Sequence, residues 1–338
     1  MVAKIQNEWA SYFSLWLKRD LFLSLELIYK KMKRIICILS LFLFLFASCR
    51  SSKELAEKKF SSADLALMEN QKKEGIKKAE ILESVTSLYG TYKGVDRIKY
   101  YDFRHPDVPK AFHGFKIAFI SDLHYKSLFQ KEGLLNLVRL LNEQKPDALF
   151  MGGDFYEGCE NIPELFAELS KVKTPYGSYS VLGNNDYEIC YEQGIKEMEK
   201  YGMKVLEHKV DTIYKGKKYI LVAGIRNPFD LNKNGVSPTL SLKGDDFVLL
   251  LTHTPDYAEG VSIRNADLVL AGHTHGGQVR LLGYAPIIPS KYGQRFLTGL
   301  KYTTLGYPII ITNGLGTSQV NMRFSSPSEI VMITLLCP

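Results

Sequence analysis

Beyond residue 96 the hydrophobic residues fall into short blocks separated by polar stretches, and the blocks follow two periods. Runs of four to seven apolar residues predict buried strands, and apolar residues at helical spacing predict amphipathic helices. Strands are predicted at 115–121, 148–152, 178–183, 219–225, 247–253, 267–273, 278–282, 308–314 and 329–335. Helices are predicted at 134–141, ended by Pro146, and near 161–172 and 187–201. This alternation predicts an α/β fold, and the strand-rich second half favours two sheets packed face to face.

The stretch before this region has a different composition. Residues 50–95 are rich in Lys, Glu, Ser and Ala and contain no Pro. Their apolar positions, such as Ile81, Val85 and Leu88, have helical spacing. We therefore expect residues 49–95 to form a solvated, partly helical tether, and residues 96–338 to form the main domain.

An export signal precedes the tether. From Met32 two cations lead into thirteen largely apolar residues, 35–47, which are too few for the roughly 20 that span a bilayer. This pattern is that of a signal peptide over 32–48. Cys49 follows Phe-Ala-Ser and resembles the lipidated cysteine of bacterial lipoproteins, although Phe46 stands where Leu is usual. We expect a membrane-anchored, extracytoplasmic lipoprotein, and the alternative is an uncleaved membrane anchor.

Two further expectations concern the start codon and the cysteines. Residues 1–31 are interpreted as a gene-model extension ahead of Met32, with an amphipathic membrane-surface segment as the alternative. The chain has no C-x-x-C pair, which excludes a zinc ribbon or a thioredoxin-like site. Cys159 and Cys190 follow neighbouring strands, so a disulfide between them is conceivable in an oxidising compartment, but two free thiols are the favoured expectation.

Composition and charge narrow the function classes. With 46% hydrophobic and 23% charged residues, the chain is an ordinary globular protein, which excludes wholesale disorder and collagen-like repeats. The net charge of +7 is concentrated in the first 48 residues, which hold seven Lys/Arg and three Asp/Glu. The nearly balanced remainder gives no reason to expect a nucleic-acid partner, and a nuclease is therefore disfavoured.

Polar clusters follow five of the predicted strands. They are Ser121-Asp122-Leu123-His124, Gly152-Gly153-Asp154, Gly183-Asn184-Asn185-Asp186, Thr252-His253-Thr254 and Gly272-His273-Thr274-His275. A single cluster would carry little weight, because Asp after a strand is often a helix cap. Five clusters predict one site, since open α/β sheets place their sites at the carboxyl edge of the strands.

The residue types of these clusters indicate metal binding. Along an extended strand Asp122 and His124 point to one face, and His273 and His275 repeat that geometry. Mixed imidazole and carboxylate ligands suit Mn, Fe or Zn better than Ca or Mg. Seven candidate ligands exceed the needs of one ion, but two ions sharing a carboxylate use them all. The glycines before Asp154, Asn184 and His273 are expected to let the backbone turn sharply.

The order D-x-H, G-D, G-N-x-D, H, G-H-x-H resembles that of the calcineurin-like metallophosphoesterase superfamily over about residues 110–338. The sequence GHTHGGQVRL, then SKYGQ and GLGTS, is similar to the membrane-associated bacterial phosphodiesterases, which have relatives among UDP-2,3-diacylglucosamine hydrolases. The resemblance implies a four-layer αββα sandwich of two mixed sheets. It implies one metal on Asp122, His124, Asp154 and His275, and a second on Asp154, Asn184, His253 and His273.

One residue departs from the family pattern. Most members carry G-N-H-D, where the histidine protonates the leaving group or stabilises the transition state, and here that position is Asn185. An amide cannot act as a general acid, which disfavours monoesters with poor leaving groups. Asn184 is expected to hold and orient the substrate, and Asp186 to brace the loop.

The resulting expectation is a dinuclear metal-dependent phosphodiesterase or pyrophosphatase in which a metal-bridging hydroxide attacks the substrate, with a lipid-linked substrate as one candidate. Two alternatives stay open. The first is a UDP-2,3-diacylglucosamine hydrolase-like enzyme of lipid A synthesis. The second is a non-catalytic, metal-binding lipoprotein.

Overall fold

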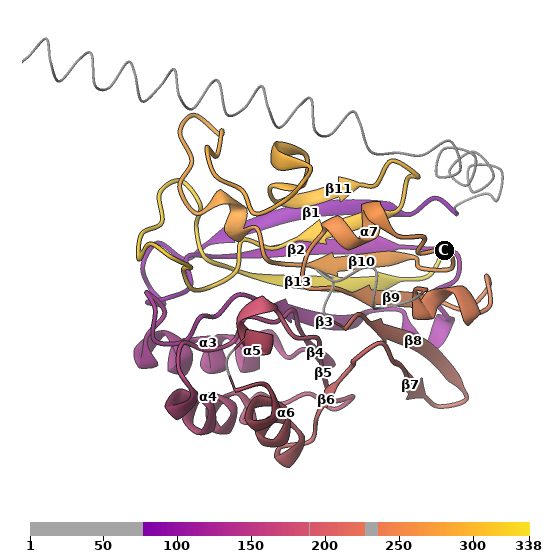
Figure 1. Cartoon of the computed structure of the whole chain (residues 1–338). Coiled ribbons are helices and arrows are strands. Elements are labelled where there is room, and N and C mark those ends of the chain that lie inside the picture. The colour runs from indigo at the N-terminus through magenta and orange to yellow at the C-terminus, as the bar shows by residue number, and fades with distance from the viewer. Residues whose placement is uncertain (1–76, 189, 227–235) are drawn as a thin grey trace, which may run out of the picture. The chain divides into compact units, whose positions relative to one another are not determined.

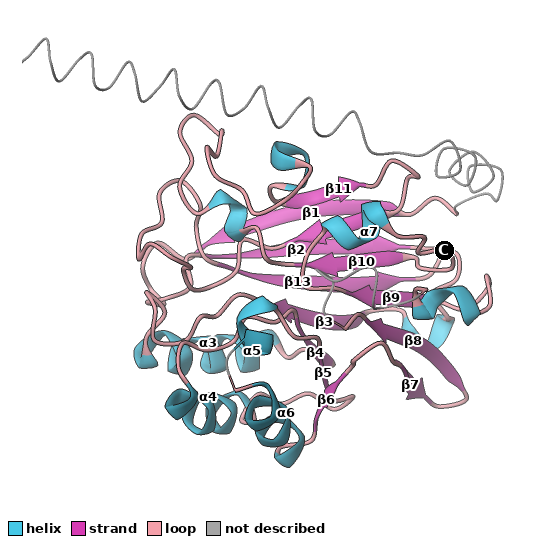
Figure 2. Cartoon of the chain, in the orientation of Figure 1, coloured by secondary structure: helices cyan, strands magenta, loops and turns pink. Residues whose placement is uncertain are grey.

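The structure, a computed structural model, describes residues 77–188, 190–226 and 236–338 (Figure 1). These residues contain two mixed sheets (Figure 2). The seven-stranded sheet has the order β1 (Glu80–Ser87), β2 (Arg97–Arg104), β13 (Glu329–Leu336), β3 (Phe115–Ile120), β4 (Ala148–Met151), β5 (Ser178–Ser180), β6 (Met203–Val205). The six-stranded sheet has the order β11 (Gly299–Tyr302), β12 (Pro308–Ile311), β10 (Leu268–Ala271), β9 (Val248–Leu251), β8 (Lys218–Gly224), β7 (Val210–Lys215).

Helices and short 3-10 turns cover the outer faces of the two sheets. The helices are α3 (Lys131–Gln144), α4 (Ile162–Leu169), α5 (Asn184–Glu188), α6 (Tyr191–Lys200) and α7 (Asp256–Gly260). Figure 1 shows α3, α4 and α6 together on the side of the seven-stranded sheet. The six-stranded sheet has a thinner cover, which includes α7 and the 3-10 turn Gly293–Phe296.

Three hydrophobic clusters lie between the four layers and pack them together. Helices α3, α4 and α6 pack on one face of the seven-stranded sheet, and the two sheets pack on each other through residues such as Phe119 and Leu249. The third cluster joins the six-stranded sheet to Tyr257 and Phe296. Strand β3 is buried on both faces, with Ile117 facing the other sheet and Ala118 facing the helices. The predicted four-layer αββα sandwich is therefore confirmed, and the two-sided burial explains the continuous apolar runs of the central strands.

The strand directions determine where polar residues gather. Strands β3, β4, β5 and β6 are mutually parallel, and so are β8, β9, β10 and β12. Within each set the carboxyl ends therefore meet at one edge of the sheet. The loops that leave these edges carry the polar clusters of the sequence.

The tether prediction is wrong for residues 80–87. They form strand β1, which pairs antiparallel with β2 over eight residue pairs from Glu80↔Arg104 to Ser87↔Arg97. The strand lies at the edge of its sheet and is mostly exposed, so it lacks the alternation that identifies a half-buried strand. The helical spacing of Ile81 and Val85 is a coincidence. The sheet of the main domain thus begins before residue 96.

Two other assignments differ from the sequence predictions. Residues 278–282 form a loop with isolated bridges at Val279 and Leu281, not a strand. The predicted helix 187–201 is two helices, α5 and α6, because the chain passes through a left-handed residue, Cys190, between them. The sequence analysis predicted no strand at the positions of β2, β6, β7 and β11.

Several predicted segments lie outside the described residues. They are the extension 1–31, the signal peptide 32–48, Cys49 and the tether as far as residue 76. Among the described helices, none is long and apolar enough to cross a bilayer.

The structure joins Cys159 and Cys190 in a disulfide, so the expectation of two free thiols is wrong. Their Cα atoms lie 5.8 Å apart, well inside the range that a disulfide bridges. Cys159 follows β4, and Cys190 lies between α5 and α6. The strands that lead into these two segments, β4 and β5, are neighbours. The bond therefore ties together two loops that emerge from the same sheet edge.

Replacing Cys190 by Ser should destabilise the domain by about 3 to 4 kcal/mol, because the bond closes a loop with a sequence separation of 31 residues in the unfolded chain. The measurement is urea unfolding of the Cys190→Ser variant beside the wild type, under oxidising conditions. Cys337→Ser is the matched control, because Cys337 is a free cysteine. Equal midpoints for wild type with and without reductant would contradict the disulfide.

Candidate metal centre

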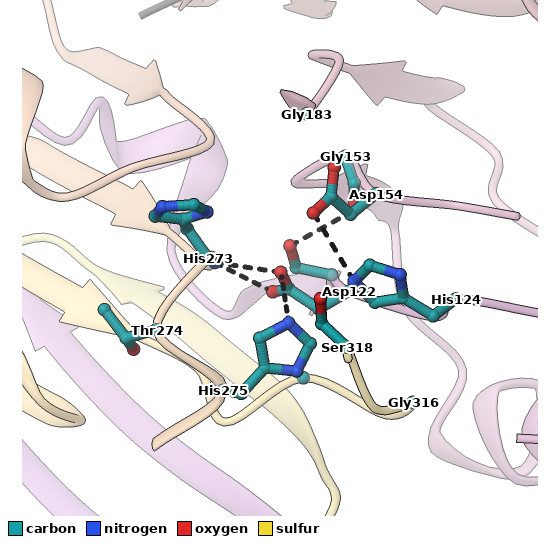
Figure 3. A network of polar contacts seen from close by, with 12 residues as sticks. Asp122, His124, Gly153, Asp154, Gly183, His273, Thr274, His275, Gly316 and Ser318 are labelled. Carbon is teal, nitrogen blue, oxygen red and sulfur yellow. Dashed lines mark hydrogen bonds and ion pairs between the residues drawn. The ribbon is translucent and has the colours of Figure 1, made fainter. Parts of the chain in front are cut away.

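Six of the predicted ligands lie in loops that directly follow the central strands, and Figure 3 labels all of them except His253. Asp122 and His124 follow β3, Asp154 follows β4, His253 follows β9, and His273 and His275 follow β10. Their potential ligand atoms form two groups, and within each group all atoms lie within 4.8 Å of one another. The groups are Asp122, His124, Asp154 and His275, and Asp154, His253 and His273. Asp154 belongs to both, so the structure brings together residues from both sheets around one carboxylate.

The backbone at these residues is not extended, so the strand alternation expected from the sequence does not explain why their side chains converge. Strand β3 ends at Ile120 and β10 ends at Ala271, before either pair begins. Five of the ligand residues have positive φ: Asp122 (51°), His124 (38°), Asp154 (56°), His273 (69°) and His275 (52°). Left-handed backbone is costly for residues other than glycine and persists where the surroundings enforce it, often at functional sites. Turns, not strand alternation, therefore aim these side chains inward.

The glycines of the clusters have two different functions. Gly153 has φ +93° and provides a turn, as expected. Gly183 and Gly272 instead permit close approach of a carboxylate. A Cβ on Gly183 would lie 2.1 Å from Oδ1 of Asp154, and one on Gly272 would lie 2.3 Å from Oδ2 of Asp122. Any side chain at these two positions would displace a candidate ligand.

His124 is oriented by a carboxylate that the sequence analysis did not single out. Its Nδ1 lies 2.7 Å from Oε1 of Glu157, and since a carboxylate accepts, Nδ1 carries the proton. The lone pair is then on Nε2, which lies 3.4 Å from Oδ2 of Asp154 and has no hydrogen-bond partner among the described residues. A metal-ligating histidine typically has this pattern, with its other nitrogen bonded to a carboxylate. Glu157 lies three residues after Asp154, and that proximity was the available signal.

His253 shows the same arrangement with a backbone partner. Its Nδ1 lies 2.7 Å from the carbonyl oxygen of Gly152, to which it donates. Its Nε2 lies 3.3 Å from Oδ2 of Asp154 and 3.1 Å from Nδ1 of His273. Two imidazole nitrogens that face each other at this distance need a proton or a metal cation between them. Because its proton is held by the backbone carbonyl, His253 has the form of a ligand and not of a general base.

The pKa shifts follow from burial and from the opposed charges. Burial alone would raise the pKa of Asp154, but His253 and His124 outweigh it and hold this pKa well below its usual range. Burial favours neutral His253, yet the Asp154 carboxylate raises the pKa of His253 to about 9. For His273, burial and then the charge of His253 lower the pKa to about 3. The surroundings of Asp154 thus favour positive charge beside an ionised carboxylate.

Asp186 holds the two neighbouring loops together. Its carboxylate accepts hydrogen bonds from the backbone N–H groups of Asp154 (2.7 Å), Phe155 (3.0 Å) and Gly183 (2.8 Å). Burial, followed by the charge of Asp154, raises the pKa of Asp186 to about 7, against these three donors. All three bonds fix backbone, so Asp186 braces the loops after β4 and β5.

Asn184 and Asn185 begin helix α5, close to both loops. The side-chain oxygen of Asn184 is buried and has no hydrogen-bond partner among the described residues, as an amide ligand to a metal requires. Asn185 donates its backbone N–H to Asp154 Oδ1 (3.0 Å) and its side-chain Nδ2 to Glu157 Oε1 (3.2 Å). Asn185 therefore supports Glu157 and His124, and it offers no acidic proton.

Arg323 is a second residue that the sequence analysis left without a role. Its guanidinium donates to the backbone carbonyls of Asn313, Gly316, His275 and Ser326. Burial lowers the pKa of Arg323 to about 10. These bonds fix the turn that carries His275 against the loop after β12. No motif in a single sequence indicates such a backbone anchor.

A third His/Asp group lies away from this centre. His105, Asp107 and Asp267 also approach within 4.8 Å. There, Nζ of Lys77 lies 2.6 Å from Oδ1 of Asp107, and Nδ1 of His105 accepts from the backbone N–H of Asp107. A lysine already provides the positive charge, so this group does not resemble a metal site.

The donors around Asp154 fit divalent metal ions. The two groups combine carboxylate oxygens with imidazole nitrogens, a mixture that transition metals prefer to calcium or magnesium. Burial of polar atoms without partners is costly, and Nε2 of His124 and Oδ1 of Asn184 are both in this state. A bound cation would satisfy both atoms.

Comparison with known proteins agrees with this geometry. Residues 115–277 match the family described as calcineurin-like phosphoesterase. The chain is 31% identical over 233 residues to the uncharacterized metallophosphoesterase YkuE of Bacillus subtilis. The aligned region covers 68% of this chain and 81% of that protein. It is 28% identical to the phosphodiesterase YaeI of Escherichia coli, over 66% of this chain and 82% of that protein. A Danio rerio transmembrane protein with a metallophosphoesterase domain is 27% identical, over 88% of this chain and 70% of that protein.

The family match contains the loops after β3, β4, β9 and β10, and both buried Asp/His groups around Asp154 lie within it. The chain therefore belongs to the calcineurin-like metallophosphoesterases, a family of metal-dependent phosphoric ester hydrolases.

Proposed function

We propose that the protein is a phosphodiesterase or pyrophosphatase that uses two divalent transition metal ions, Mn, Fe or Zn, on the outer surface of a membrane. The observation that carries this proposal is the pair of ligand groups that share Asp154. One ion would be held by Asp122, His124, Asp154 and His275, and the other by Asp154, Asn184, His253 and His273. When bound, the two ions supply Lewis acidity, which neutralises charge on the phosphoryl group and lowers the pKa of the attacking water.

The protein's own residues contribute orientation. Glu157 and the Gly152 carbonyl each hold one imidazole proton, so His124 and His253 present lone pairs to the centre. Asp186 and Arg323 fix the loops on two sides of it. Preorganised ligands of this kind require little rearrangement during reaction.

The absence of an acidic proton at Asn185 points to the class of substrate. Without a donor at that position, the leaving group must depart with little assistance from the chain. Diesters and pyrophosphates with stable leaving groups fit this requirement better than alkyl monoesters. The E. coli relative is named a phosphodiesterase, which supports the same choice.

The proposed location rests on the N-terminal sequence. A charged segment, a short apolar segment and a small-residue exit precede Cys49. We propose that Cys49 carries the lipid anchor of the mature protein. An anchor on the outer surface would keep the enzyme from UDP-linked substrates of the cytoplasm, which disfavours the lipid A hydrolase alternative.

Asp154→Ala should lower kcat/KM for a chromogenic diester with Mn²⁺ by about 10³-fold or more, because the shared ligand of both ions is lost. Bound metal, measured by elemental analysis, should fall as well. Asp107→Ala is the matched control, since Asp107 belongs to the His/Asp group already balanced by Lys77. Retention of full activity by Asp154→Ala would refute the dinuclear centre.

Asn185→His should accelerate poor leaving groups most, by up to roughly 10²-fold, because the new imidazole would stand beside Glu157 and could donate a proton. Asp186 is committed to three backbone donors and would not orient it. The test is kcat/KM for a series of aryl and alkyl diesters in both proteins. An equal loss for every substrate, with an unchanged dependence on leaving-group pKa, would show that Asn185 only shapes the pocket.

Intact-protein mass spectrometry of material from the membrane fraction should find a chain that starts at a lipid-modified Cys49. A Cys49→Ser variant should stay unmodified and retain the signal peptide. A tryptic peptide that begins upstream and contains unmodified Cys49 in the wild-type protein would refute the anchor.

A further inference from the structure

Three loops around the metal centre carry exposed apolar side chains. The first loop follows β3 and the second follows β10, each just beyond the ligands on that segment. The third loop follows β12. We call their exposed residues the apolar rim: Leu128, Leu281, Leu282, Val320, Met322 and Phe324. Each of these side chains is at least about half exposed. Single exposed hydrophobic side chains are common, but a cluster of them on one surface is unusual in a soluble protein.

Hydrogen bonds join the three loops into one surface. Arg280 donates its backbone N–H to the Phe324 carbonyl (2.8 Å), and Phe324 donates to the Gln278 carbonyl (2.9 Å). On the other side, the backbone N–H of Leu128 donates to Oγ1 of Thr317 (3.3 Å). Figure 1 shows the loops after β10 and β12, in orange and yellow, at one end of the sheets. The rim is therefore a connected feature beside the centre, not a scatter of separate residues.

Leu282 is the most informative member of the rim. Leu281 and Tyr284 exchange two backbone hydrogen bonds, of 2.8 and 3.0 Å, across a two-residue turn. Both central residues have positive φ, 50° at Leu282 and 85° at Gly283. Such turns favour Asn or Gly at the first central position, because a bulky side chain is strained there. Leu282 occupies it with its side chain fully exposed, so both the backbone and the burial are unfavourable for leucine in water.

The charges of this region identify the type of surface that would accept the rim. From Leu268 to Ser328 the chain contains five Lys/Arg and no Asp or Glu. Arg295 is paired with Glu259, and Arg323 is buried against backbone carbonyls. The remaining positive charge of the segment comes from the exposed Lys291 and the half-buried Arg280 and Lys301. Apolar side chains at loop tips, on a chain segment with excess positive charge, match a bilayer surface that contains anionic lipids.

We propose that the apolar rim docks the enzyme on an anionic lipid surface, so that the metal centre takes a phosphodiester carried by a lipid. Side chains at the tips of three loops insert among acyl chains without the shape complementarity that a protein partner requires. Insertion would also remove the unfavourable exposure of Leu282. The substrate part of this inference rests on the proposed phosphodiesterase function, and the docking part does not.

Docking is tested by fluorescence of the full chain on vesicles of phosphatidylglycerol that carry brominated acyl chains. Leu282→Trp should be quenched more strongly than Leu82→Trp, whose exposed position lies on strand β1. The wild-type signal is subtracted to remove Trp9 and Trp16. The difference should shrink when phosphatidylcholine replaces the anionic lipid. Equal quenching at the two positions would overturn the proposal. Burial of the apolar rim in a dimer interface would overturn it as well.

The substrate part is tested with two diesters that share one leaving group, 4-nitrophenyl methyl phosphate in solution and 4-nitrophenyl hexadecyl phosphate in phosphatidylglycerol vesicles. Leu282→Asn should lower the ratio of lipid to soluble activity roughly fivefold to tenfold, as expected when about half of a leucine side chain is no longer buried. Since Asn is favoured in this turn, the variant should melt no lower than wild type. Leu82→Asn should keep the wild-type ratio.

The outcomes separate the two proposals. If wild type cleaves neither diester with Mn²⁺, the proposed function is wrong, and the quenching result still decides docking. If wild type cleaves both and Leu282→Asn keeps the ratio, a lipid-borne substrate is wrong.

Discussion

One buried carboxylate, Asp154, lies between two groups of imidazoles, and much of the surrounding structure maintains the charge balance at that point. A buried carboxylate is unstable unless opposite charge or hydrogen-bond donors compensate it. His124 and His253 face it from opposite groups, and the backbone of Asn185 donates to it. Because these partners come from both sheets, the balance also determines how the sheet edges are held relative to each other.

The chemistry of the site could be predicted from the sequence because it depends on residue type and on strand order. Buried strands are recognisable as apolar runs, and the carboxyl ends of parallel strands must lie at one edge. Asp122 and Asp154 therefore had to lie at one edge of their sheet, whereas His273 follows β10 of the other sheet and reaches them because the two sheets pack face to face. Their local geometry was predicted wrongly, because left-handed φ values at non-glycine residues follow from tertiary contacts and leave no pattern in a single sequence.

The residues that were missed share a physical property: they act through contacts with distant backbone or with one ligand. Glu157 holds a proton of His124, and Arg323 binds four backbone carbonyls. Strand β1 was missed because an exposed edge strand needs neither alternation nor apolar residues. The Cys159–Cys190 bond depends on a distance that spacing alone does not determine.

The position of β13 constrains the order in which the domain can form. This last strand lies between β2 and β3, pairing with β2 in parallel and with β3 antiparallel. The β1–β2 hairpin has no other contact with the sheet through strand pairing, so it cannot join until residues 329–336 are available. Pairing between segments more than 200 residues apart raises the contact order and slows folding. The seven-stranded sheet therefore cannot be completed until its C-terminal strand has been made. If the protein is exported unfolded, as the proposed signal peptide implies, this late closure of the sheet suits that route.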